Sequence, residues 1–266
     1  MSSNLNRAPR LVRSRLLAYY YGRGRLAVFT IAPPQLNRPR PISTAPLKAT
    51  KMASPLLKWD NPSPERSIQR LLDAGDINKW GWIVYRTAYQ PELDAAWAML
   101  QRLVLENLHE SIAESDAPEI ADRMDWPFVA GPELEGASLD ELKRRFRAWA
   151  RADAPRGLGP YEPGISRGSR YDFFVQADEE ALRSLVPDPG STHSALLSSA
   201  HVNLVRGWVD PRQGEEATDA NGEPVDNEDW MKIQLDVIST HYYIELGDDD
   251  AWYAYYRAPP DGICMS

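Results

Sequence analysis

Cysteine is almost absent from this chain of 266 residues. The single cysteine, Cys264, is the third residue from the end. One thiol cannot form a disulfide framework within the chain, and it cannot supply a cysteine-based zinc site. A thiol so close to a chain end is also a poor candidate for a nucleophile held against a base. The scarcity of cysteine fits a reducing compartment, so we expect an intracellular protein.

Long apolar runs and several familiar catalytic motifs are missing as well. No uninterrupted apolar stretch approaches the roughly 18 residues that a membrane-spanning helix needs. The GxGxxG and GxxxxGK[ST] turns that bind phosphate groups and the HExxH zinc motif do not occur. The sequence therefore assigns no catalytic residue, no metal and no cofactor, and it leaves open whether the protein is an enzyme.

Acidic residues are absent from the beginning of the chain. Residues 1–59 contain eight Arg and three Lys but no Asp or Glu, so this segment has a formal charge of +11. Because the whole chain has a charge of −8, the remainder carries −19. An acidic body argues against a nucleic-acid platform, which needs clustered positive charge. We expect an unknown protein or a small molecule as the partner, with no nucleic acid and no membrane span.

The basic start of the chain is predicted to be a disordered extension over residues 1–51. Its Arg- and Ser-containing, acid-free composition is typical of a mitochondrial transit peptide. Alternatively, Met52 begins the sequence Met-Ala-Ser-Pro, which could be the true start, or the segment could be a plain tail. Residues 52–266 are predicted to form a single domain. We expect a cytoplasmic location, or a mitochondrial one if residues 1–51 are genuine.

Helix boundaries are well marked in the body of the chain. Ser63 before a proline and a glutamate predicts a helix start, and Gly75 predicts its end in the left-handed conformation. Pro91 opens the longest helix, whose apolar residues recur at spacings of three and four up to position 112. Ser138 begins a helix with the spacing of a capping box, and Asp178 caps a short one.

Aromatic and β-branched segments predict the strands of a sheet. Unevenly spaced strands and irregular alternation with helices argue against a sandwich and against a doubly wound parallel sheet. We therefore predict an α+β fold with a mostly antiparallel sheet of about five strands and helices packed on one face. The last strand, at a sheet edge, could equally mediate a homodimer. The predicted strands cover residues 80–89, 171–176, 201–209, 230–237 and 252–257.

Several charged residues are predicted to be surface features. Lys143, with the arginines that follow it, is interpreted as the outer face of an amphipathic helix. The acidic stretch 210–229, including Asp229, is interpreted as a solvated loop. In the strand at 230–237, Lys232 is expected on the polar face, opposite apolar neighbours.

Histidine is scarce, and its spacing suggests the only candidate binding residues. His241 and Glu245 are four residues apart, so one helical turn would place both on one face, as metal ligands require. Two ligands are too few for a site, and we predict no metal. Arg86 and His201 lie on predicted strands that could bring them near this pair in a cleft. The speculative binding set is therefore Arg86, His201, His241 and Glu245.

Six segments together carry a resemblance to a known family: WGWIVYRTAY, DELKRRFRAW, RYDFFVQADEEAL, HVNLVRGW, WMKI and DDDAWYAYYRAPP. The chain resembles a large family of uncharacterised proteins of filamentous (ascomycete) fungi over about residues 60 to 260. Many chains of that family begin close to the position of Met52. The resemblance implies a fungal origin, but it implies no activity, cofactor or site residue.

Two functional hypotheses remain at this point. The first is a non-enzymatic, intracellular binding or interaction protein with an acidic, aromatic-rich surface. The alternative is an enzyme or small-ligand-binding protein with an unrecognised site near His201 and His241. Two histidines and a carboxylate within about 4 Å of one another in a pocket would favour the second hypothesis.

Overall fold

The structure is a computed structural model. It describes residues 62–155, 157–160, 162, 166–186, 192–209, 229–259 and 262–265. The predicted basic extension and the predicted acidic loop up to residue 228 lie outside these ranges, so both interpretations stay predictions. Within the ranges described, no helix combines the length and the apolar character needed to cross a membrane.

Helices and short strands follow one another in irregular order along the described part of the chain, which confirms the α+β class. The strands are β1 (Val84–Arg86), β2 (Phe128–Val129), β3 (Phe173–Ala177), β4 (His201–Arg206), β5 (Trp230–Gln234) and β6 (Ile263–Cys264). The α-helices are α1 (Pro64–Ala74), α2 (Asp94–Ala113), α3 (Leu139–Asp153), α4 (Ser169–Asp172), α5 (Glu179–Ser184), α6 (His193–Ser199), α7 (Thr240–Glu245) and α8 (Asp249–Tyr255). The 3-10 helices are η1 (Pro91–Leu93), η2 (Pro118–Arg123), η3 (Pro132–Leu134) and η5 (Leu235–Val237).

Local capping explains where the helices begin and end. The Ser63 hydroxyl accepts a hydrogen bond from the backbone of Arg66 at 3.0 Å, at the start of α1. Gly75 ends α1 with a φ of 70°, a left-handed conformation that glycine adopts without steric cost. The Ser138 hydroxyl caps α3 in the same way as Ser63 caps α1. The predicted start and end of α1 and the predicted start of α3 are therefore confirmed.

The described strands form one mixed sheet of six strands in the order β2-β1-β3-β4-β5-β6. β1 pairs in parallel with β2 and β3, and β5 pairs in parallel with β6, whereas β4 is antiparallel to both of its neighbours. The prediction of a mostly antiparallel sheet of five strands was wrong. The chain passes from β1 through α2 to β2 on one side of β1, and then returns through α3 to β3 on the other side of β1. Because β2 has only two residues, its sequence shows no strand periodicity, and the two parallel connections could not be predicted.

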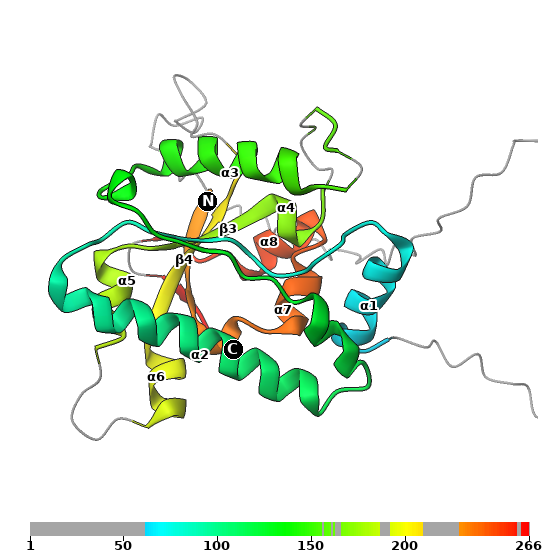
Figure 1. Ribbon diagram of the computed structural model, residues 1–266, viewed down its shortest axis with the longest axis horizontal. Helices are drawn as coiled ribbons and strands as arrows, with labels where there is room; N and C mark the ends of the chain where they lie inside the picture. The colour runs from blue at the N-terminus through cyan, green and yellow to red at the C-terminus, as the bar shows by residue number, and fades with distance from the viewer. Residues whose placement is uncertain are drawn as a thin grey trace, which may run out of the picture. The chain divides into compact units, whose positions relative to one another are not determined.

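Helices cover both faces of the sheet, so the prediction of helices on one face was also wrong. Figure 1 shows α3 on one side of the strands and α2 on the other. Phe146 of α3 packs on Phe174 of β3, with ring centroids 5.2 Å apart. On the other face, Trp97 of α2 meets Phe128 of β2 at 5.8 Å. Crossovers of one hand that move in opposite directions along a sheet place their helices on opposite faces.

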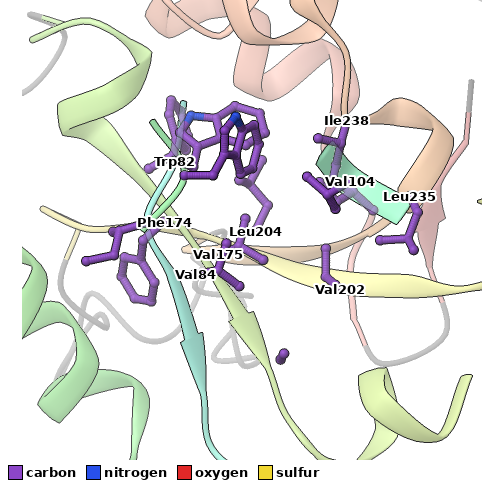
Figure 2. Close-up of a cluster of buried hydrophobic side chains, with 14 of the residues drawn as sticks. Trp82, Val84, Val104, Phe174, Val175, Val202, Leu204, Leu235 and Ile238 are labelled. Carbon is purple, nitrogen blue, oxygen red and sulfur yellow. The ribbon is translucent and has the colours of Figure 1, made fainter. Parts of the chain in front are cut away.

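The face that α2 covers is the apolar face of the sheet. Val175 of β3 lies opposite Leu204 of β4, and Val202 lies opposite Ile233 of β5. Figure 2 shows strand residues of this face together with Val104 of α2 and with residues of the η5 segment. All of these side chains are buried. Much of the hydrophobic core therefore lies between this face and the helices packed on it, and the Phe146–Phe174 contact extends the core to the other face.

The segment 252–257 is mostly a helix, where the sequence predicted a strand. The Asp248 side chain accepts a hydrogen bond from the backbone of Asp250 and caps α8. Trp252 of α8 is fully buried and stacks on Phe173, with ring centroids 5.5 Å apart. The run of aromatic residues imitates a strand, but the acidic cap starts a helix. The last described strand of the sheet is β6, and a homodimer stays a prediction.

Lys143 and Asp229 are buried, although the sequence placed both at the surface. Their side chains are 1% and 5% exposed, and Nζ of Lys143 donates to Oδ2 of Asp229 at 2.6 Å. The register of α3 against the sheet decides this burial. Arg144 and Arg145, the next residues along α3, do pair with Glu141 on the outer side as expected.

Gly207 should be intolerant of a side chain because α3 packs directly on it. A Cβ atom there would collide with the ring of Phe146, which is fully buried. We expect Gly207→Ala to lower the free energy of unfolding by about 1–3 kcal/mol, the usual cost of overpacking a core. The control is Gly159→Ala, because a Cβ at Gly159 meets no atom within 4 Å. Equal stability of the two variants in urea denaturation would contradict this packing.

Candidate functional site

A line of polar side chains crosses the face of the sheet opposite to the apolar face. Gln176 of β3, Asn203 of β4 and Lys232 of β5 are direct cross-strand neighbours. Thr87, which follows β1, continues the line beside Gln176. We call these four residues the polar row. Each is between 3% and 8% exposed, so the row is a buried polar feature in the middle of a sheet.

Hydrogen bonds connect one half of the polar row. Nε2 of Gln176 donates to Oγ1 of Thr87 at 3.3 Å. Nδ2 of Asn203 donates to Oε1 of Gln176 at 3.4 Å and to Oδ2 of Asp178 at 2.7 Å. Asp178 also caps α5 by accepting from the backbone of Ala181 at 2.9 Å. These contacts fix the orientation of both amide side chains.

Charged groups gather at the other half of the row. Nζ of Lys232 donates to Oε1 of Glu180 at 2.6 Å. The same carboxylate oxygen lies 3.6 Å from Nε2 of His201. The hydrogen bond from Lys232 holds the pKa of Glu180 below its ordinary value. Glu180, whose side chain is 62% exposed, therefore stays ionised and connects the buried row to the surface.

His201 is buried beside this ion pair, and one of its nitrogens has no hydrogen-bond partner in the part of the chain that the structure describes. Nε2 makes no hydrogen bond and is shielded from solvent, since 3.6 Å to Glu180 is too long for one. Burial is the main cause that lowers the pKa of His201, and Lys232 adds to it, while Glu180 and Asp178 act in the opposite direction. The imidazole is therefore neutral at pH 7, with a polar atom that awaits a hydrogen bond.

One end of the polar row lies close to the place where ligands bind in sheets with parallel strands. Thr87 directly follows β1, and Asp178 directly follows β3, so both lie at the carboxyl ends of two adjacent parallel strands. Ligands of open α/β sheets bind outside these carboxyl ends. The arrangement offers amide groups, an ammonium, two carboxylates and a neutral imidazole. Such groups can recognise the polar atoms of a small molecule.

The four residues of the predicted binding set lie in three places. His201 joins the polar row through Glu180. His241 and Glu245 face each other on α7, with Nε2 and Oε1 at 3.1 Å, and the histidine is 65% exposed. Arg86 is buried, donates to Asp94 at 2.7 Å and lies 4.7 Å from the ring of Tyr89. Of the predicted set, the structure therefore brings together His241 and Glu245. His201 and Arg86 each lie elsewhere, with contacts of their own.

An open hollow of about 450 Å³ lies beside His241 and Glu245, between α7 and α8. The Tyr255 hydroxyl donates to Glu245 at its edge. Tyr253, on the same helix as Tyr255, is 55% exposed. The hollow is acidic and partly apolar, and it is lined by Ile244, Glu245, Asp248, Asp250, Ala251, Ala254 and Tyr255.

Sequence reasoning missed most of the polar row. The alternation in residues 230–237 does mark Lys232 as polar among apolar neighbours, and this was the only usable signal. Gln176 and Asn203 are single polar residues within short strands, and nothing local shows that they are neighbours. Only the register of β3, β4 and β5 brings them together.

The sequence also contains GISRG at residues 164–168, which has the GxSxG spacing of serine hydrolases. In a hydrolase, this serine sits on a turn between a strand and a helix, next to a histidine. Here the Ser166 hydroxyl donates to Oδ2 of Asp172 at 2.7 Å, and it accepts from the backbone of Gly168 at 3.0 Å. The serine thus stabilises the turn before α4, and its hydroxyl donates to a carboxylate rather than to a histidine.

Acidification is expected to weaken the fold through His201. Because burial lowers the pKa of His201 below its ordinary 6.5, the unfolded chain binds this proton more tightly than the folded chain. Its stabilising effect is complete above about pH 6.5 and is lost as the pH falls through the lower folded value. Urea denaturation at pH 7 and pH 5 should show a smaller loss for His201→Gln than for the wild type. Equal losses would assign the effect to other groups.

The side chains of the polar row and its neighbours Asp178, Glu180 and His201 interact through hydrogen bonds and ion pairs. Within the described ranges, no group of three or more His, Cys, Asp or Glu side chains is arranged to hold a metal ion. Comparison of the chain with protein-family models, with curated proteins and with solved structures gives no match, so the polar row has to be interpreted from its own geometry.

Proposed function

We propose that this domain is a binding protein that holds a small polar molecule against the polar row. The observation that carries the proposal is the buried Nε2 atom of His201, which lies beside the Glu180–Lys232 pair and has no hydrogen-bond partner among the described residues. Buried polar atoms in folded proteins are nearly always satisfied, and an exception needs an explanation. A ligand that reaches Nε2 would supply the missing hydrogen bond.

The energetics of the sheet support the same interpretation. Each buried polar side chain costs about 1–3 kcal/mol if its hydrogen bonds are incomplete. On the apolar face, the same three strands carry Val175, Leu204 and Ile233, which need no such partners. Apolar side chains on both faces would stabilise this sheet without that cost. A network kept at this cost is typical of a site that recognises a ligand.

Binding is favoured over catalysis by the state of Glu180. A general base works best when its pKa lies near the working pH. The hydrogen bond from Lys232 lowers the pKa of Glu180, which makes this carboxylate a weaker base. The geometry therefore suits recognition, with Glu180 as an ionised partner for a ligand.

A thermal-shift screen tests this proposal on the intact chain. The library contains amino acids, sugars, nucleosides and polyamines. A ligand at about 100 times its Kd stabilises the folded state by about 2.7 kcal/mol. For a domain of this size, that corresponds to a rise in Tm of about 5–10 °C. Native mass spectrometry of protein purified from its own cells provides a second measurement of a retained ligand.

Asn203→Leu should abolish the stabilisation by any ligand found. Asn107→Leu is the matched control, because Asn107 lies on α2 and donates to the carbonyl of Ile238, on the other side of the sheet from the row. Ligands that stabilise both variants as well as the wild type would bind elsewhere and would overturn the proposal. A folded protein that gives no hit and no retained mass would also count against it.

Interaction with a basic segment of another protein is the second candidate function. It is favoured by the hollow between α7 and α8, where Glu245, Asp248 and Asp250 surround an apolar floor. Acidic side chains attract Lys- and Arg-rich segments, and the effect weakens with salt. An arginine-rich peptide should bind the wild type more tightly at low salt than Asp248→Asn/Asp250→Asn. Equal binding by both proteins would exclude this surface.

A further inference from the structure

The charges around His201 are unbalanced, and this limits which ligands the polar row accepts. The groups that face the imidazole are Glu180 and Asp178 at the start of α5 and Lys232 of β5. Because the imidazole is neutral, the charged groups near it are the two carboxylates of Glu180 and Asp178 and the one ammonium of Lys232. The surroundings of Nε2 therefore carry a net charge of −1. This inference rests on the proposed function and concerns the ligand of the same site.

The hydrogen-bonding capacity of the site has the same bias. Oε1 of Glu180 already accepts from Lys232 at 2.6 Å, whereas no contact of its second oxygen is recorded within the described residues. A neutral imidazole carries one nitrogen with a free lone pair, and the unpartnered Nε2 can fill that role. Both atoms call for donors rather than acceptors. A carboxylate or phosphate on the ligand would meet negative charge and would leave the buried Nε2 of His201 without a donor.

We propose that the ligand of the polar row carries a protonated amine, which donates hydrogen bonds to Nε2 of His201 and to the carboxylate of Glu180. An ammonium has three N–H donors, so it can reach both acceptors at once. It also neutralises the excess negative charge at a partly buried position, where hydrogen bonds between charged groups are strong. The amides of Gln176 and Asn203 are left to bind neutral polar atoms of the same molecule.

Three small probes of similar shape and different charge test the ammonium. Propylamine, propanol and propionate are titrated at pH 7.5 into the full chain, and the ring signals of His201 are followed by NMR. Propylamine should shift these signals in a saturable way, whereas propanol and propionate should not. Glu180→Gln should weaken the binding of propylamine about 10-fold to 100-fold, the effect of losing one charged hydrogen bond.

Glu179→Gln is the matched control for charge. Glu179 precedes Glu180 on α5, but its carboxylate pairs with Arg183 at 2.8 Å and accepts from Gln90 at 3.0 Å. The binding of propylamine to this variant should equal that of the wild type. Circular dichroism checks that both variants are folded.

Other outcomes separate this inference from the proposed function. Stronger binding of propionate than of propylamine at His201 would overturn the ammonium, while a ligand at the polar row would still be supported. Equal weakening in both glutamate variants would show a general effect of charge and would also overturn it. If none of the three probes shifts the NMR signals of His201, the inference of an ammonium on the ligand is wrong. The thermal-shift screen alone then decides the proposed function.

Discussion

Replacing Arg170 with methionine is expected to lower the free energy of unfolding by about 3–5 kcal/mol, the usual result of breaking a buried ion pair on one side. The Arg170 side chain is fully buried and contacts the carboxylates of Asp125 at 2.6 Å and Asp153 at 3.0 Å. Its Nη1 group also donates to the carbonyls of Gly81 and Asp125 at 3.0 Å. One guanidinium thus joins segments before β1, before β2 and at the end of α3.

Chemical denaturation of Arg170→Met against Arg183→Met measures this effect. Arg183 pairs with Glu179 at 2.8 Å, but both side chains are about half exposed, so its loss should cost less than about 1 kcal/mol. Arg170→Lys should recover only part of the loss, because an ammonium cannot reproduce the planar set of donors. A loss of unfolding free energy below about 1 kcal/mol for Arg170→Met would show that the Arg170 guanidinium does not hold these segments together.

Lys143→Met is expected to have the second large effect, again about 3–5 kcal/mol of unfolding free energy. The variant would leave the carboxylate of Asp229 buried without the cation that pairs with it among the described residues, since Nζ of Lys143 lies 2.6 Å from it. The backbone of Asp229 also accepts from Arg206 at 2.8 Å, so this residue cannot easily turn toward solvent. Arg144→Met, at the next position of α3, removes a side chain that is 71% exposed and should cost less than about 1 kcal/mol.

A double-mutant cycle separates the pair from its surroundings. Asp229→Asn alone should be destabilising, and Lys143→Met combined with Asp229→Asn should cost less than the two single changes added together. The expected coupling free energy is about 0.5–3 kcal/mol, as for residues in direct contact. Strict additivity in denaturation experiments would mean that the ion pair contributes nothing specific to the link between α3 and β5.

Local signals predicted the helices well and the sheet poorly. Ser63, Gly75, Ser138 and Asp178 mark helix boundaries through contacts within four residues, so the sequence carries the whole signal. The sheet depends on pairing between distant segments. The parallel pairing of β1 with β2 was missed because β2 has only two residues. The last described strand, β6, was missed because the aromatic sequence of α8 resembles a strand.

The candidate site divides in the same way. The spacing of four between His241 and Glu245 pointed to a shared face on condition that the segment is helical, and α7 meets that condition. The proximity of His201, Glu180 and Lys232 was not predicted, because these residues come from β4, α5 and β5. His201 was selected for its residue type, without its partners.

By itself, the sequence determined the bounds of α1, the starts of α3 and α5, the α+β class and the separation of a basic start from an acidic body. The tertiary structure alone decided the strand order, the burial of Lys143 and the assembly of the polar row. Helix caps and turns act over a few residues, so composition and spacing reveal them. Cross-strand neighbours such as Gln176 and Asn203 are 27 positions apart, and only the packing of the whole sheet sets their register.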